Sequence, residues 1–343
     1  MLGGDILENG PGRILMVGHP MMDIYACVEQ DVIDITGVRR GESNRISLDV
    51  FNVLQEKVRV NSKNPGGSCA STARSYAYLG GNVSYFGICG EDELATKFED
   101  CLTECGVKVL SIRKKDHPTS QTYCLVTPDA ERTMCVLFGA SHTLKLGDMD
   151  GSIMDNFDFY VVSGYMFADE DQTAFTHYMV DEALKRGKRI ITTFSNSFCV
   201  RRNGHFLKPI AEKSAYITGN LEEFTELYEM NDREALFSMF EKRTVGENPM
   251  NIAVVITMGA EGAVIIYQGK RLHIPAPPVE KVVDTTGAGD FFAGGVLYGL
   301  LNGLSVRKAG ALGAVMAGDI IGHVGTLITD DLPARVKAVM ESA

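Results

Sequence analysis

The chain has 343 residues, of which 45% are hydrophobic and 22% charged, which is typical of a globular protein with a large buried core. Its formal net charge of −11 argues against a broad basic surface for nucleic acid or for an anionic membrane. A phosphorylated small molecule stays compatible with this charge, because backbone N–H groups bind phosphate without net positive charge.

The eight cysteines are scattered, and they form neither a C-x-x-C pair nor a Cys/His cluster with the spacing of a zinc site. We therefore expect free thiols in a reducing compartment. Residues 1–12 carry no basic stretch followed by an apolar core, and no apolar run reaches the length of a membrane span. The expectation is a soluble cytoplasmic protein with neither nucleic acid nor membrane as a partner.

The first apolar run, residues 13–18, predicts a buried strand that ends in H-P-M-M-D, residues 19–23. In an open α/β sheet, polar groups just past the carboxyl end of a strand line the ligand crevice. Asp23 is therefore either a ligand for substrate hydroxyls or an ordinary turn residue, and this segment alone favours the turn.

Residues 64–74, N-P-G-G-S-C-A-S-T-A-R, place a proline and two glycines before a small-residue helix that runs to Leu79. A tight backbone followed by a helix start suits sugar hydroxyls as well as an anion. A plain turn between two elements is the alternative.

A hairpin is predicted further along, because β-branched and aromatic runs at 122–126 and 134–138 flank a Pro-Asp turn. From residue 158 the chain alternates strands and helices, which predicts a mostly parallel sheet with helices on both faces. Right-handed crossovers then place all strand carboxyl ends along one edge. The expected strands are 159–162, 189–194, 215–217 and 252–257, and the expected helices are 94–105, 171–186, 204–213, 222–229, 232–243 and 305–321.

Two shorter patterns lie within this alternating region. Asn220 and Glu223 open a predicted helix, where the carboxylate either holds hydrated Mg²⁺ through water or completes a capping box, and the local pattern favours the box. The run T-M-G-A-E-G, residues 257–262, ends a strand, and such glycine turns are moderate evidence for a nucleotide loop.

The most informative run is D-T-T-G-A-G-D-F-F-A-G-G, residues 284–295. We expect a strand at 279–283, then a glycine turn, then an apolar helix from Phe291 to Leu301. Glycines allow a ligand to approach the backbone closely, and the free N–H groups at a helix start favour an anion.

A carboxylate at Asp290 is electrostatically awkward in such an anion-binding turn. It has a purpose there if it takes a proton from a hydroxyl that attacks phosphorus while the helix start holds the transferring group. Capping of a buried helix is the alternative, and this run alone leaves the two interpretations about even.

The 284–295 run resembles the C-terminal signature of the ribokinase-like (PfkB) family of sugar and nucleoside kinases, and residues 64–92 resemble its N-terminal signature. The resemblance covers nearly the whole chain in order. It implies an α/β fold, a three-layer α/β/α sandwich, in a single kinase domain spanning 1–343, with a small β-sheet lid formed by about 24–48 and 113–139. The activity it implies is ATP-dependent phosphorylation of a primary hydroxyl.

The resemblance also assigns roles to individual residues. It makes Asp290 the catalytic base and the amides of Gly287, Ala288 and Gly289 an anion hole, helped by Arg132 of the E-R-T segment. The implied substrate contacts are Asp23, Gly66, Gly67, Ser68 and Ser71, with His19 and Ser71 standing where relatives carry Asn. The implied ATP contacts are Asn220, Thr257, Gly259, Gly262, Gly287, Gly289 and His323. Mg²⁺ is expected on Glu223 through water, and a monovalent cation such as K⁺ on Asp284 and Thr286.

The segments G-H-P-M-M-D, N-P-G-G-S and T-P-D-A-E-R-T-M resemble adenosine kinase-like members of the family. The expected substrate is adenosine or a related nucleoside, and the alternatives are a sugar such as ribose or fructose, or a non-catalytic ligand-binding protein of the same fold. Tyr123, Leu125 and Phe138 form either an apolar face for a bound base or the core of the hairpin. The expected assembly is a monomer or a homodimer.

Overall fold

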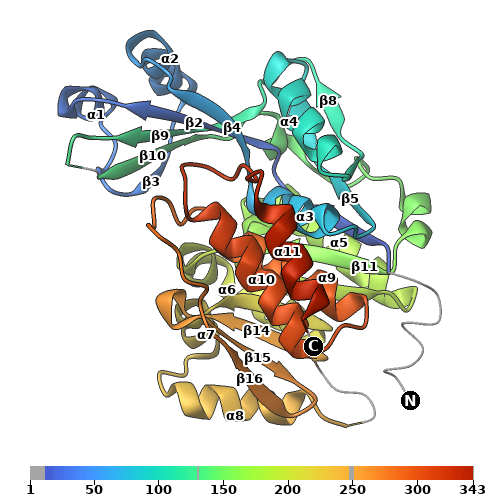
Figure 1. Ribbon diagram of the computed structural model, residues 1–343. Helices are drawn as coiled ribbons and strands as arrows, with labels where there is room; N and C mark the ends of the chain where they lie inside the picture. The colour runs from blue at the N-terminus through green and yellow to red at the C-terminus, as the bar shows by residue number, and fades with distance from the viewer. Residues whose placement is uncertain (1–11, 130, 247–250, 343) are drawn as a thin grey trace.

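The computed structural model describes residues 12–129, 131–246 and 251–342, so the prediction for residues 1–12 lies, except for Gly12, outside the described residues. Within the described part, the strands form a nine-stranded sheet, a five-stranded sheet and a two-stranded sheet (Figure 1). None of the helices in this part combines the length and the hydropathy that crossing a bilayer requires.

The large sheet has the strand order β16-β15-β14-β13-β12-β11-β1-β5-β7. Its strands are β1 Ile14–Val17, β5 Val83–Phe86, β7 Lys108–Val109, β11 Phe159–Ser163, β12 Arg189–Thr193, β13 Tyr216–Asn220, β14 Ala253–Thr257, β15 Ala263–Tyr267 and β16 Lys270–Ile274. Every pairing from β14 to β7 is parallel, which confirms the predicted parallel sheet. The antiparallel hairpin β15–β16, which extends the sheet at one edge, was not predicted.

Helices cover both faces of this sheet, because successive strand residues point to opposite sides. Leu15 and Val17 of β1 contribute to one core, whereas Ile14 and Met16 contribute to the other. The first core is covered by α5 Glu170–Lys185, α6 Ser197–Lys213, α7 Leu221–Tyr228 and α8 Arg233–Arg243. The opposite side carries α3 Ser68–Tyr78, α4 Glu93–Glu104, α9 Ala288–Leu301, α10 Val306–Ile320 and α11 Leu332–Glu341. This arrangement confirms the three-layer α/β/α sandwich.

The five-stranded sheet has the order β3-β10-β9-β2-β4. Its strands are β2 Met21–Cys27, β3 Ser43–Arg45, β4 Ser62–Gly66, β9 Ser120–Val126 and β10 Arg132–Leu137. Helices α1 Gln30–Thr36 and α2 Leu48–Lys57 lie on the side of this sheet that points away from the large sheet (Figure 1). The expected small second sheet is therefore present, and it also includes β4, which lies outside the segments expected for it.

Short elements complete the described chain. The two-stranded sheet pairs β6 Ile88–Gly90 with β8 Ile112–Lys114, and single 3₁₀ turns are η1 Ala140–Thr143, η2 Gly151–Asn156, η3 Gly164–Phe167 and η4 Gly259–Glu261. The two 3₁₀ turns η3 and η4 follow β11 and β14, at the carboxyl edge of the large sheet.

The two faces of the β9–β10 hairpin have different surroundings. Tyr123 and Leu125 of β9 are buried in the core that α1 and α2 cover, so of the two interpretations for this pair the hairpin core is correct. Along β10 the odd-numbered residues are buried on the same side, whereas Arg132, Met134 and Val136 are half-buried. Because side chains alternate along a strand, these three residues point to the opposite face, toward the rest of the chain.

Several expected element bounds were wrong, including the start of the apolar helix, which lies at Ala288 and not at Phe291. Residues 279–283 do not form a strand, and Val282 and Val283 are 54% and 42% exposed. The helix expected at 204–213 begins earlier, at Ser197, because the Asn196 side chain accepts a hydrogen bond from the Cys199 N–H at 2.7 Å and caps it there.

Candidate functional site

The N-termini of α3 and α9 meet at the carboxyl edge of the large sheet. Each helix begins after a glycine with positive φ, which is 90° at Gly67 and 77° at Gly287. The helices approach so closely that a Cβ on Gly294 would lie 2.5 Å from the Cβ of Ser75. The two glycine-containing segments that the sequence singled out therefore form one site.

Asp290 lies in the first turn of α9 and is half-buried. Its Oδ1 accepts a hydrogen bond from the Ser68 Oγ at 2.5 Å. Burial raises the pKa of Asp290, the Ser68 hydrogen bond lowers it, and the neighbouring carboxylate of Glu223 raises it; the net result is a pKa of about 7. A carboxylate with this pKa is suited to accept a proton near neutral pH.

The turn before Asp290 presents backbone N–H groups to open space. A Cβ added at Gly289 would meet no atom within 4 Å, and Gly289 is exposed. The Ala288 N–H donates to the Thr285 carbonyl at 3.2 Å, whereas the N–H groups of Gly287 and Gly289 have no acceptor in the described part of the chain. Of the three amides predicted for the anion hole, these two are ready to bind a ligand.

Arg132 reaches from the small sheet to the segment that precedes this turn. Its Nη1 donates to the Asp284 Oδ1 at 2.8 Å and to the Thr286 Oγ1 at 3.0 Å. Burial would raise the pKa of Asp284, but the hydrogen bonds from Arg132 and Thr286 outweigh it and hold that pKa below its usual value. The structure thus joins Arg132 to the two residues that were predicted to bind a monovalent cation.

Asp23 lies on β2, beside β4. A Cβ added at Gly66 would lie 2.3 Å from an Asp23 carboxylate oxygen, so this close approach requires glycine. Burial and the charge of Asp284 raise the pKa of Asp23, whereas Arg132 lowers it, and the net result is a pKa of about 7. Ser71 is buried, and its Oγ lies 4.0 Å from where a Cβ of Gly287 would be, so it sits between the two helix starts.

Asn220 and Glu223 form a complete capping box at the start of α7. The Asn220 Oδ1 accepts from the Glu223 N–H at 2.8 Å, and the Glu223 Oε2 accepts from the Asn220 N–H at 2.8 Å. Burial nevertheless raises the pKa of Glu223 to about 7, with Asn220 opposing and Glu222 adding to the shift. A buried carboxylate of this kind is stabilised by a nearby cation, so the Mg²⁺ role stays a prediction.

The predicted nucleotide loop follows β14, next to the end of β13, since Thr257 pairs with Asn220. Gly259 and Gly262 both have positive φ, and a Cβ at Gly262 would lie 2.1 Å from the Ile274 carbonyl oxygen. Gly259 faces open space. His323 lies in the segment that follows α10, and its Nε2 is buried without a hydrogen-bond partner among the described residues.

Two residues at the carboxyl edge of the large sheet, Tyr165 and Ser195, were not predicted from the sequence. Tyr165 follows β11 and lies close enough to Asp290 and Glu223 for both carboxylates to raise its pKa, although burial has the larger effect. Ser195 follows β12 with a φ of 75°, and its Oγ lies 2.8 Å from the Ser163 Oγ. Their positions just past strand ends were the available signal.

Arg74 on α3 was also missed as a site residue. It is only 2% exposed, and its guanidinium donates to the Thr326 Oγ1 at 3.1 Å and to the Thr326 carbonyl at 2.7 Å. The Thr326 Cγ2 lies 2.6 Å from where a Cβ of Gly287 would be. Arg74 therefore supports the loop that packs against the glycine turn. The sequence feature that could have identified Arg74 is a single arginine within a predicted helix of small residues.

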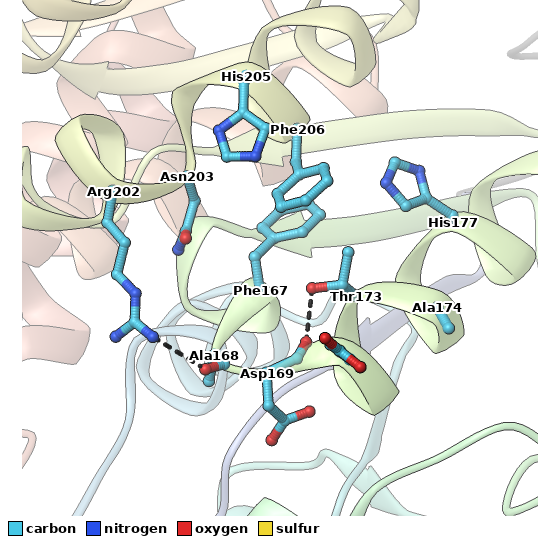
Figure 2. Close-up of a pocket in the computed structure, with 11 residues that line it drawn as sticks. Phe167, Ala168, Asp169, Thr173, Ala174, His177, Arg202, Asn203, His205 and Phe206 are labelled. Carbon is cyan, nitrogen blue, oxygen red and sulfur yellow. Dashed lines mark hydrogen bonds between the residues drawn. The ribbon is translucent and has the colours of Figure 1, made fainter.

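A hollow of about 470 Å³ lies apart from these groups, between η3, α5 and α6 (Figure 2). The rings of Phe167 and Phe206 stack there with centroids 5.7 Å apart, and Arg202 donates to the Ala168 carbonyl at 3.3 Å. No residue predicted for the site lines this hollow. The predicted chemistry therefore belongs to the converging helix starts.

Comparisons with known proteins agree with this geometry. Residues 13–334 match the model of the pfkB family carbohydrate kinases. The chain is 23% identical over 332 residues to adenosine kinase from Saccharomyces cerevisiae, which covers 91% of this chain and 95% of that protein.

Two solved structures are similar over nearly their whole length. The crystal structure of adenosine kinase from Sinorhizobium meliloti has a TM-score of 0.83 at 27% identity, covering 97% of this chain and 100% of that one. A probable sugar kinase protein from Rhizobium etli CFN 42 has a TM-score of 0.84 at 27% identity, covering 96% and 99%. The chain therefore belongs to the pfkB family of carbohydrate kinases.

Proposed function

We propose that this kinase transfers the terminal phosphoryl group of ATP to a primary hydroxyl of a nucleoside, with the 5′-OH of adenosine as the first choice. Asp290 accepts the hydroxyl proton as the oxygen–phosphorus bond forms and the bond to ADP breaks. The amides of Gly287 and Gly289, with that of Ala288 beside them, stabilise the charge on the transferring group.

One observation carries this proposal. A carboxylate with a pKa of about 7 is held by the Ser68 hydroxyl at 2.5 Å, beside free N–H groups at the start of α9. A protein that only bound phosphate would gain nothing from an acceptor carboxylate at that place, because the two negative charges repel each other. Catalysis explains the arrangement.

The half-buried face of β10 supports a nucleoside rather than a free sugar. Met134 and Val136 are apolar and point away from the core under α1 and α2. Phe138 follows them, and its ring lies edge-on to His19 with centroids 5.9 Å apart. An apolar strip with an aromatic ring suits the face of a planar base, whereas a free sugar needs hydrogen-bonding groups. In this proposal Asp23 accepts hydrogen bonds from the ribose hydroxyls.

The remaining groups fit ATP and its metal. The open turn at Gly259 lets a nucleotide approach the backbone. Thr257 and Asn220 lie side by side at the ends of their strands, and with Gly262 and His323 they are the further contacts that we propose for ATP. Glu223 would hold Mg²⁺ through water, and when bound the ion neutralises phosphate charge. Asp284 and Thr286 would ligate a monovalent cation, in place of the hydrogen bonds that they now accept from Arg132.

The test is a coupled ADP-release assay with adenosine, other nucleosides, ribose and fructose, at equal enzyme and ATP concentrations. We expect kcat/KM for adenosine to exceed that for ribose by about 10² or more, because the base adds contacts made only by the nucleoside. A higher kcat/KM on ribose or fructose assigns a sugar kinase. ATP binding without ADP release for every alcohol assigns a non-catalytic protein.

A further inference from the structure

His19 lies between the end of β1 and the start of β2, among residues to which the proposed function assigns the substrate. A Cβ on Gly67 would lie 2.8 Å from the His19 carbonyl oxygen, and the Phe138 ring lies edge-on to the imidazole with centroids 5.9 Å apart. The His19 side chain is largely buried. A neutral imidazole offers one donor and one acceptor, and its neighbours decide which nitrogen is which.

The neighbour that decides this for His19 is the side chain of Gln172 on α5, which is fully buried. The His19 Nε2 lies 2.9 Å from the Gln172 Oε1, although 153 positions separate the two residues in the chain. The Gln172 Nε2 donates to the Ser141 carbonyl at 3.3 Å. Because a carbonyl only accepts, the amide must turn its NH₂ group toward Ser141 and its oxygen toward His19. The His19 Nε2 therefore carries the proton.

A second imidazole, that of His142, contacts the same amide. The His142 Nδ1 lies 3.5 Å from the Gln172 Nε2, and the His142 Nε2 lies 3.1 Å from the Asp169 Oδ2. An ionised carboxylate only accepts, so Asp169 favours a proton on the His142 Nε2 and leaves Nδ1 to accept from Gln172. Arg45 competes for that Nε2 at 3.2 Å, but the Ser141 carbonyl orients Gln172 whichever contact prevails.

The surroundings also keep His19 neutral. Burial lowers the pKa of His19, the Gln172 hydrogen bond raises it, His142 lowers it and Asp169 raises it, and the balance lies below the ordinary value. Arg45 on β3, which contacts His142, is a further positive charge near this group and disfavours another. At neutral pH the ring therefore has one proton, on Nε2.

The other ring nitrogen of His19, Nδ1, is left as a bare acceptor. It has no hydrogen-bond partner in the described part of the chain, and it is not sealed from the surface as the partnerless Oη of Tyr85 is. It therefore reaches accessible space next to the residues proposed to hold the substrate. A largely buried acceptor gains from a ligand that brings a donor to it.

We propose that Gln172 is a positioning residue that holds His19 as the neutral Nε2–H tautomer, so that Nδ1 accepts a hydrogen bond from a hydroxyl or amino group of the substrate. A substrate with an acceptor at that place is disfavoured, because two lone pairs then face each other. This recognition of the substrate rests on the proposed function, whereas the tautomer of His19 does not.

The tautomer is measured on the intact chain, labelled with ¹⁵N in histidine, by long-range ¹H–¹⁵N correlation spectra that distinguish protonated from bare ring nitrogens. His19→Asn identifies the His19 signals by their loss. We expect a protonated Nε2 and a bare Nδ1 at pH 7.5, and a ring that is still mostly neutral at pH 6.5, where an ordinary histidine is half protonated. A protonated Nδ1 at pH 7.5, or a His19 that is half protonated at pH 6.5 or above, overturns the assignment.

Two variants of Gln172 test the positioning. Gln172→Leu removes the oxygen that fixes the Nε2 proton, so both tautomers should appear, and kcat/KM for adenosine should fall about five- to tenfold, through KM more than through kcat. Gln172→Glu keeps an acceptor but raises the pKa of His19. Its loss relative to wild type should therefore grow as the pH falls from 8.5 to 6, because a charged His19 has no acceptor nitrogen.

Thr176→Val is the matched control. Thr176 lies one turn further along α5, is fully buried, and donates to the backbone carbonyl of Gln172 at 2.8 Å without touching His19. It should keep the wild-type tautomer and a kcat/KM within about twofold, since the side chain of Gln172 stays in place. A Gln172→Leu chain with the wild-type tautomer, or with a loss no larger than that of Thr176→Val, overturns the positioning role.

Substrate analogues identify the donor that Nδ1 receives. We compare kcat/KM for adenosine, 2′-deoxyadenosine, 3′-deoxyadenosine and inosine in wild type and in Gln172→Leu. The analogue that lacks this donor should lose no more than about twofold in the variant, whereas the others should lose about five- to tenfold. Equal losses for all four overturn the contact with the substrate. A chain that turns over no alcohol overturns the proposed function and this contact with it, while the spectra still decide the tautomer.

Discussion

The hydroxyl of Ser68 and the carboxylate of Asp290 lie 2.5 Å apart, although 222 positions separate them in the chain. The hydroxyl donates to the carboxylate and stabilises its charged form, against burial and the repulsion from Glu223. Ser68 was predicted as a substrate contact, and in the structure its hydroxyl is bonded to the candidate base. We therefore propose that Ser68 positions Asp290, while its predicted contact with substrate stays a prediction.

Ser68→Ala removes this donor, so the pKa of Asp290 should rise above about 7. Because a protonated Asp290 accepts no proton, the acid limb of the kcat/KM profile should move to higher pH by about half a unit to one unit. Activity at pH 6 should fall severalfold more than activity at pH 8.5. Ser68→Thr keeps the hydroxyl and is the control; an identical acid limb in wild type and alanine variant would contradict this role.

Asp290→Asn should lower kcat by about 10² or more while ATP binding persists, the usual scale for losing a general base.

The same substitution should stabilise the fold at pH 8. Burial raises the pKa of Asp290 above its unfolded value, so the folded chain binds the extra proton between about pH 4 and pH 7 and loses stability as pH rises through that window. Asparagine removes the buried charge. The free energy of unfolding, measured with urea, should therefore rise by about 1 kcal/mol at pH 8 but not at pH 4.

Glu223→Gln should shift the pH profile in the opposite direction to Ser68→Ala. Glu223 raises the pKa of Asp290 by repulsion, so neutralising it should move the acid limb down by a few tenths of a pH unit. KM for Mg-ATP should rise as well if Glu223 holds the metal. Glu222→Gln, at the exposed neighbouring position, is the matched control. A shift of the acid limb to higher pH in Glu223→Gln would rule out the repulsion between Glu223 and Asp290.

Arg132→Met should expose the dependence of Asp284 on its partner. The Asp284 carboxylate is nearly inaccessible and accepts from the Arg132 Nη1 at 2.8 Å, so losing the guanidinium leaves a buried charge unpaired. We expect a loss of about 2–4 kcal/mol in the free energy of unfolding at pH 8. The double variant Arg132→Met with Asp284→Asn should recover part of this lost stability. If the losses of the two single variants simply add in this double-mutant cycle, Arg132 and Asp284 are not coupled.

Val136→Asp tests the substrate class directly. The substitution places a carboxylate on the apolar face of β10, where the proposal puts the base. KM for adenosine should rise about tenfold or more, since a charged group opposes burial of the base, whereas turnover of ribose should stay within about twofold. An equal loss for both substrates would place the defect in the fold, and a circular dichroism melt distinguishes that case.

The sequence predicted the parallel part of the large sheet and the glycine turns before α3 and α9 because their signals are local. Glycine turns at Gly67 and Gly287 require positive φ, and their small flanking residues permit the close contact of α3 with α9. The strand expected at 279–283 failed for a physical reason: valine favours extended backbone, but a strand forms only where a neighbour offers hydrogen bonds. Here the described chain offers one short bond, from the Val283 N–H to the Ile321 carbonyl at 2.8 Å.

Contacts between distant segments were not predictable from local pattern. Nothing near Arg132 indicates that it reaches Asp284 and Thr286 on another part of the chain, and nothing near Arg74 indicates Thr326. Such partners depend on how elements pack, and a side chain chooses its partner only once the core has formed. The hairpin faces illustrate the same limit, because alternation alone does not show which side of β9 the helices α1 and α2 cover.

The convergence of α3 and α9 also sets when the chain becomes a kinase during synthesis. The proposed hydroxyl-binding residues lie before residue 75, but the proposed phosphate-binding turn comes only with residues 284–290, and Thr326, which packs against Gly287, comes later still. A ribosome-bound chain that stops at residue 280 holds most of the large sheet and no place for the transferred group. Under the proposed function we therefore expect no phosphorylation by an N-terminal fragment until the last few dozen residues have emerged.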